Sequence, residues 1–81
     1  MLIKQFENIM TSLDLRNLAA AGGNIIISAT GFTALDLSNA ATNGRHAKLK
    51  LTIKNAKQLS ALDCRNIAAA NPGNITFDFT E

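Results

Sequence analysis

One eight-residue pattern occurs three times in this chain of 81 residues. It consists of an apolar residue, Ser or Thr, a small residue, Leu, Asp, an apolar residue, any residue and Asn. The copies span residues 10–17, 32–39 and 59–66, and each is followed by alanines, a turn and an alternating apolar run. Recurrence at this period is typical of repeat architectures. We therefore predict a single domain over residues 1–81, with repeats at about 10–31, 32–58 and 59–81.

Each copy contains the signature of a helix N-terminus. A Ser or Thr hydroxyl can accept a hydrogen bond from the backbone N–H three residues later, and the Asp there can reach back to the N–H of the cap. The predicted capping boxes pair Thr11 with Asp14, Thr33 with Asp36, and Ser60 with Asp63. An apolar residue before each cap and another four residues into the helix form a hydrophobic staple. We therefore expect helices to begin at these three points.

The other element limits follow from turn signals and from alternation. Gly22-Gly23, Asn43-Gly44 and Asn71-Pro72-Gly73 predict helix ends. Helices are therefore expected over 12–21, 34–43 and 61–70. Strands are expected over 24–29, 47–54 and 74–80, where apolar residues are concentrated or alternate with polar ones, and a further strand near 2–7.

These elements predict the order β-α-β-α-β-α-β. Successive strands joined by helices favour a parallel sheet with right-handed crossovers. Strict alternation in the last two strands excludes helices on both faces of the sheet, because a sheet covered on both faces is continuously apolar. The expected fold is a small, two-layer, solenoid-like α/β module with helices on one face. The opposite face is expected to be open and largely polar, with Ile26 as its exception.

A second interpretation of the repeat exists. The stretch Phe32-x-x-Leu35-x-Leu37-x-Asn39 resembles the consensus of leucine-rich repeats, with the Asn one residue early. That resemblance implies that each Leu-Asp-apolar segment is a strand and that Asn17, Asn39 and Asn66 form a ladder of buried side chains. It would make the chain a leucine-rich-repeat-like binding fragment. The caps, staples and glycine stops favour the helical interpretation.

Basic residues form one candidate binding set. Its members are Arg45, Lys48, Lys50, Lys54 and Lys57. Lysines on an exposed strand face commonly maintain solubility and discourage edge pairing. The alternative function is that of a weak module for binding anions or nucleic acid. Because no aromatic residues are interleaved among these lysines, stacking on single-stranded bases is not supported.

Reactive side chains give no pattern of catalysis. Cys64 aligns with Leu15 and Leu37, which predicts a core position. His46 lies in a predicted turn without a second His, Cys or acidic residue at metal-ligand spacing. The three repeated Asp residues are explained as helix caps. We therefore predict no catalytic residue, metal site or cofactor, and a chain that is not an enzyme.

The expected function is protein–protein interaction or self-assembly. Phe77 and Phe79 lie in the last predicted strand, which carries little charge and has no polar cap after it. Exposed strand edges pair readily with another chain. A homodimer through this strand or the adjoining helix edge is therefore expected, or else a protein partner.

Composition sets the expected compartment. The net charge is only +2, which is too small to indicate nucleic-acid binding by itself. The single Cys excludes an internal disulfide framework and suits a reducing compartment. No apolar run approaches the length of a membrane span, and no signal peptide is recognisable. A cytoplasmic protein with no membrane partner is therefore expected.

Overall fold

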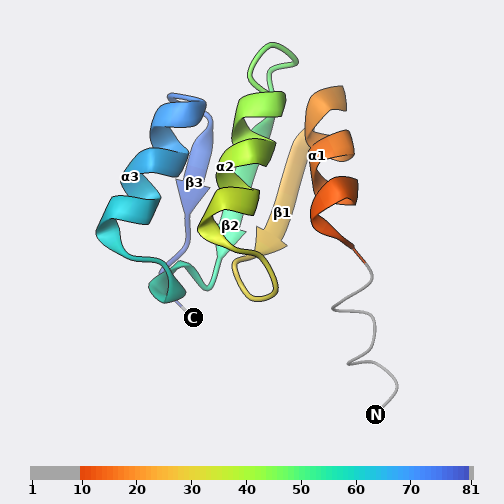
Figure 1. Ribbon diagram of the computed structural model, residues 1–81. Coiled ribbons are helices and arrows are strands. Elements are labelled where there is room, and N and C mark those ends of the chain that lie inside the picture. Colours follow the sequence, from red (N-terminus) through yellow and green to blue (C-terminus); the bar gives the residue numbers. More distant parts are fainter. Residues whose placement is uncertain (1–9, 81) are drawn as a thin grey trace.

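The computed structural model describes residues 10–80, which form two layers, with three helices on one face of a three-stranded sheet (Figure 1). The elements are α1 (Ser12–Ala21), β1 (Asn24–Ser28), α2 (Ala34–Asn43), β2 (Lys50–Lys54), the 3₁₀ helix η2 (Ala56–Gln58), α3 (Ala61–Ala70) and β3 (Ile75–Phe77). This confirms the predicted α/β class and its alternation of helices with parallel strands. The strand expected near residues 2–7 lies outside the described residues.

All three helices begin and end where the sequence predicts. In α2, the Thr33 hydroxyl accepts a hydrogen bond from the Asp36 N–H at 3.0 Å, and Asp36 Oδ2 accepts one from the Thr33 N–H at 3.0 Å. The same reciprocal box is formed by Thr11 with Asp14 and by Ser60 with Asp63. The Leu-Asp-apolar segments are therefore helical. The leucine-rich-repeat interpretation, which made them strands, is wrong.

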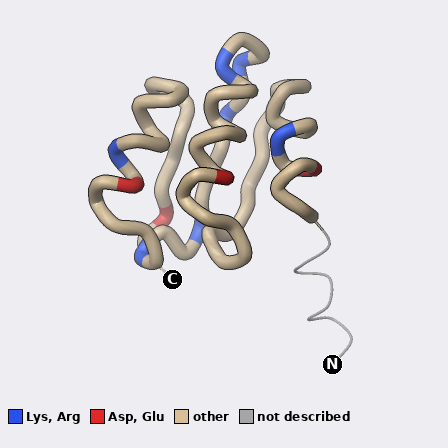
Figure 2. The backbone as a smooth tube through the Cα atoms, viewed as in Figure 1, with Lys and Arg blue, Asp and Glu red and all other residues tan. Residues whose placement is uncertain are grey.

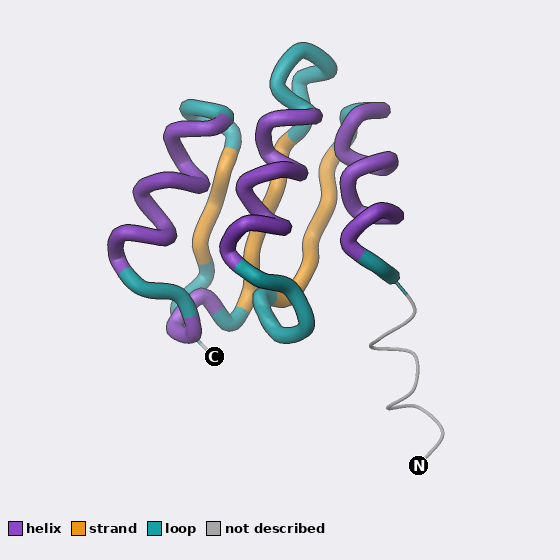
Figure 3. Tube along the Cα trace, viewed as in Figure 1, coloured by secondary structure: helices purple, strands orange, loops and turns teal. Residues whose placement is uncertain are grey.

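The sheet is open and has the order β1-β2-β3, with both pairs parallel (Figure 3). Ile26 is level with Thr52, and Thr52 is level with Thr76. The strands are shorter than predicted, and β3 covers only three residues of the expected 74–80. Pairing continues weakly beyond it, because the Asp78 N–H donates to the Ile53 carbonyl oxygen at 2.8 Å.

The core lies between the two layers. Its largest fully buried apolar side chains are Leu15, Leu37, Leu49, Leu51, Ile53 and Ile67. The residues before the three caps, Met10, Phe32 and Leu59, are partly buried against this core, as expected for hydrophobic staples. The other face of the sheet carries the polar side chains of β2, and Ile26 is 68% exposed on it, as predicted.

The loop between α2 and β2 packs against the end of α1. A Cβ at Gly44 would come within 2.5 Å of Leu49 Cβ and 2.8 Å of the Ala19 carbonyl oxygen, so no side chain fits there. Gly22 faces the Ala47 carbonyl in the same way and has a φ of 84°. Within this loop Lys48 has a φ of 62°, a left-handed backbone that a strand cannot contain. This is why β2 begins at Lys50 and not at 47 as predicted.

Candidate functional site

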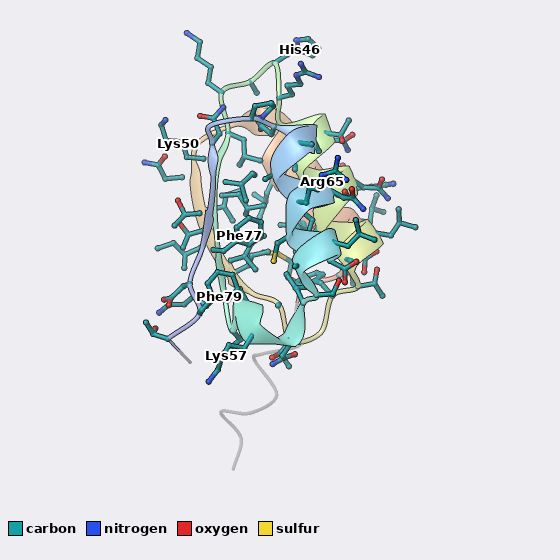
Figure 4. The ribbon with its side chains drawn as sticks, turned by 90° about the vertical axis from the view of Figure 1, so that its left-hand side faces the viewer. His46, Lys50, Lys57, Arg65, Phe77 and Phe79 are labelled. Carbon is teal, nitrogen blue, oxygen red and sulfur yellow. The ribbon has the colours of Figure 1, made fainter. Side chains whose placement is uncertain are left out.

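The predicted basic set does not form one patch. Lys50 and Lys54 both project from the open face of β2, but they are four positions apart along the strand, which is about 13 Å. Arg45 and Lys48 belong to the loop at one end of the molecule, whereas Lys57 lies in η2 at the other end (Figures 2 and 4). The structure therefore divides these five cations between two ends and places Lys48 off the strand.

Lys50 and Lys54 each lie near a polar or acidic side chain of the chain itself, which would compete with a bound anion. The Lys50 ammonium donates to Asn74 Oδ1 at 3.4 Å. Hydrogen bonds from the Thr80 hydroxyl and then from its N–H lower the pKa of Asp78, and Lys54 contributes in the same direction. The Asp78 carboxylate therefore stays ionised near Lys54 and weakens the positive potential there. This arrangement does not concentrate charge as an anion site does.

The two C-terminal phenylalanines differ in exposure. Phe77 is half-buried against the core at the end of β3, whereas Phe79 lies beyond the strand and is 51% exposed. Their ring centroids are 6.2 Å apart with the planes tilted by 31°. Figure 4 views the molecule from the side of α3 and β3 and labels both residues. Phe79 is thus the exposed apolar side chain at the end of the sheet.

The other reactive side chains remain separate. Cys64 is only half-buried although Leu15 and Leu37, at the same position of α1 and α2, are fully buried. Partial burial, and then the Asp63 carboxylate, raise the pKa of its thiol, which lowers the thiolate fraction at neutral pH. His46 is exposed in the loop after α2. Within residues 10–80, no three His, Cys, Asp or Glu side chains are grouped as metal ligands.

The Asn residues of the repeat do not form a buried ladder. Asn17 and Asn66 are exposed and Asn39 is half-buried. Between described residues, none of these three side-chain amides makes a hydrogen bond that links two helices. The predicted ladder, like the strand that would have carried it, is absent from the described part of the chain.

A row of leucines is the most distinctive exposed feature. The second residue of each helix is a leucine that is 55% exposed in α1 (Leu13), 68% in α2 (Leu35) and 59% in α3 (Leu62). We call these three residues the leucine row. The fourth residue of a helix is about 200° around the axis from the second, so when the fourth faces the core the second faces solvent. A helical wheel of each predicted helix could have shown this row, whereas the candidates chosen from the sequence were Phe77 with Phe79 and the basic residues.

The row runs across the helix layer near the helix N-termini. Between α2 and α3 the surface is hollowed by about 220 Å³, a space lined by Ala34, Leu35, Ser38, Asp63 and Asn66. Packed helices lie about 8–10 Å apart, so the three leucines form a stripe about 20 Å long. Single exposed apolar residues are ordinary, but an aligned set is a feature of interaction surfaces.

No protein-family model, curated protein or solved structure matches this chain. Among the helices of residues 10–80, none has the length and apolar character needed to span a bilayer.

Proposed function

We propose that this chain is a non-catalytic, solenoid-like α/β repeat module for protein–protein interaction, and that it binds an amphipathic helix of its partner along the leucine row. The observation that supports this is the exposure of Leu13, Leu35 and Leu62, each more than half exposed at the same position of its helix. No leucine is needed there for the core, because the fully buried residues of the three helices lie at the fourth, seventh or eighth position and never at the second.

The spacing of the row favours a helical partner. Neighbouring helices are about 8–10 Å apart. Seven residues of an α-helix advance about 10.5 Å, so apolar residues at i, i+7 and i+14 of a partner helix would meet the three leucines in turn. Such a helix would lie across α1, α2 and α3, with one anchor near the hollow beside Leu35. Helix-in-groove recognition uses anchors of this kind.

Helix binding is preferred to anion binding because of how the side chains are distributed. The leucines converge on one face, whereas the basic residues divide between two ends and lie near Asp78 and Asn74. Nucleic-acid binding requires a continuous basic stripe. The observations therefore support an apolar docking role over the alternative based on Lys50 and Lys54.

A peptide-display selection tests this proposal. Libraries of 20-residue helical peptides would be selected on the wild-type chain alone, and the enriched peptides would then be tested for binding to the Leu35→Glu variant. Ile26→Glu is the matched control, because Ile26 is as exposed as Leu35, at 68%, but lies on the opposite face. Circular dichroism would verify that both variants fold.

We expect enrichment of peptides with apolar residues every seven positions, which bind the wild type and Ile26→Glu equally. Leu35→Ala should weaken their binding about tenfold, the effect of losing about 1.4 kcal/mol of apolar burial. Peptides that bind Leu35→Glu as tightly as the wild type, or an enriched set without this spacing, would overturn the proposal.

A further inference from the structure

On the outer flank of α1, one apolar residue is exposed at a position that is buried in α2 and α3. Leu18 is the seventh residue of α1 and is 46% exposed, whereas Ala40 and Ile67 at the seventh position of α2 and α3 are completely buried. A preceding helix packs against α2 and against α3, whereas among the described residues no helix precedes α1. Beside Leu18 the surface is hollowed by about 430 Å³, a space lined by Met10, Asp14, Asn17 and Leu18. This flank therefore has the form of a helix-binding surface.

On the outer flank of α3, two residues are less buried than the residues at the same positions of α2. Cys64, its fourth residue, and Ala68, its eighth, are half-buried, whereas Leu37 and Ala41 at the same positions of α2 are fully buried. In α2 these positions contribute to the core that Ile67 of α3 completes. Figure 4 views this flank directly, with Arg65 on its helix and Phe77 on its strand. The α3 flank has the composition of a surface that receives a following helix.

The outer flanks of α1 and α3 also carry opposite charges. Within the chain, the fifth residue of α2 and the third residue of α3 meet across the helix pair, since Ser38 and Asp63 line the same hollow. On the outer flanks, the fifth residue of α3 is the exposed Arg65 and the third residue of α1 is the exposed Asp14. If the two flanks packed as α2 and α3 do, Arg65 and Asp14 would line one hollow, as Ser38 and Asp63 do within the chain.

We propose that the chain self-associates head to tail, with the α3 flank of one copy docked on the α1 flank of the next. Leu18 fills the space beside Cys64 and Ala68, as Ile67 does beside Leu37 and Ala41 within the chain. Arg65 of one copy lies opposite Asp14 of the next. The contact uses two different surfaces, so a dimer still has one free α1 flank and one free α3 flank. Further copies can therefore add, and the assembly is a ring or an open chain.

This proposal does not use the leucine row, so it and the proposed function can fail separately. Light scattering over a range of concentrations up to about a millimolar would measure the mean mass of the wild type, Leu18→Glu and Arg65→Glu. Leu13→Glu is the matched control, because it makes the same change on the same helix at a site of similar exposure. We expect mass to rise with concentration for the wild type and Leu13→Glu, and association to weaken at least about tenfold in the other two.

Mixing the two defective variants separates this contact from a symmetric one. Leu18→Glu keeps an intact α3 flank and Arg65→Glu keeps an intact α1 flank, so an equimolar mixture should form a one-to-one dimer at concentrations where each variant alone stays monomeric. A symmetric dimer through the last strand would not be restored by mixing. A strictly monomeric wild type, a loss of association in Leu13→Glu equal to that in Leu18→Glu, or a mixture that stays monomeric would overturn the proposal.

Discussion

Asn71 is a buried polar side chain that connects two parts of the fold. It is only 1% exposed. Its Nδ2 donates to the Ala41 carbonyl oxygen at 3.2 Å, and its Oδ1 accepts from Asn74 Nδ2 at 2.9 Å. The last four carbonyls of a helix lack partners within that helix, and Ala41 belongs to this group in α2. The Asn71 amide therefore satisfies the end of α2 from the turn after α3.

We predict that Asn71→Ala lowers the free energy of unfolding by about 1–3 kcal/mol, because it leaves a buried carbonyl without a donor. Urea denaturation would measure this. Asn66→Ala is the control, since Asn66 is exposed, and it should change stability by less than about 0.5 kcal/mol. Equal midpoints for Asn71→Ala and the wild type would show that the amide has no structural role.

At the scale of elements, each helix depends on its own capping box. The bonds join residues only three apart, so each box forms without help from the rest of the chain. They satisfy N–H groups that a helix of ten residues would otherwise leave unpaired. Such short helices are marginal in water, and packing on the sheet completes their stability.

We predict that Thr33→Ala destabilises the fold by about 0.5–2 kcal/mol through loss of the α2 cap. Thr42→Ala makes the same chemical change near the other end of α2. The Thr42 hydroxyl donates to the Ser38 carbonyl oxygen within the helix, a bond that adds little, so this control should be neutral or slightly stabilising. Equal effects of the two substitutions on the thermal midpoint would argue against the cap.

At the scale of the whole molecule, the two faces carry different roles. The helix layer presents the leucine row, and the far face of the sheet presents Lys50, Thr52 and Lys54, with Lys48 in the loop before them. The core between the faces does not use any of these side chains. Surface charges that are not paired contribute little to stability.

We predict that the combined change Lys48→Glu, Lys50→Glu and Lys54→Glu leaves the fold intact, within about 1 kcal/mol of the wild-type stability. A small loss is expected because Glu at 54 would lie near the ionised Asp78. Circular dichroism and urea denaturation would measure it, with Ile53→Glu as the control that unfolds because Ile53 is completely buried in the same strand. An unfolded triple variant would assign the lysines a structural role.

Sequence alone determined the helices to the residue, because the signals that begin and end a helix are local. Thr33 and Asp36 interact across one turn, and Gly22 ends α1 with a positive φ of 84° that glycine adopts readily. Alternation likewise identified β2 and its open face. Strand limits were less accurate, because the length of a strand depends on how far a neighbouring strand, distant in sequence, runs beside it, as β2 does beside β3.

Tertiary structure decided which residues share a surface. Loop 44–49 packs on the end of α1 through Gly44 beside Ala19 and Ala47 beside Gly22, which are residues far apart in sequence. The burial of Asn71 and the partial exposure of Cys64 depend on which helices have a neighbour on each side. The leucine row exists as a surface only because three helices pack side by side at one level. Local patterns specify elements, whereas sites are specified by the distances between elements, which only the packed chain defines.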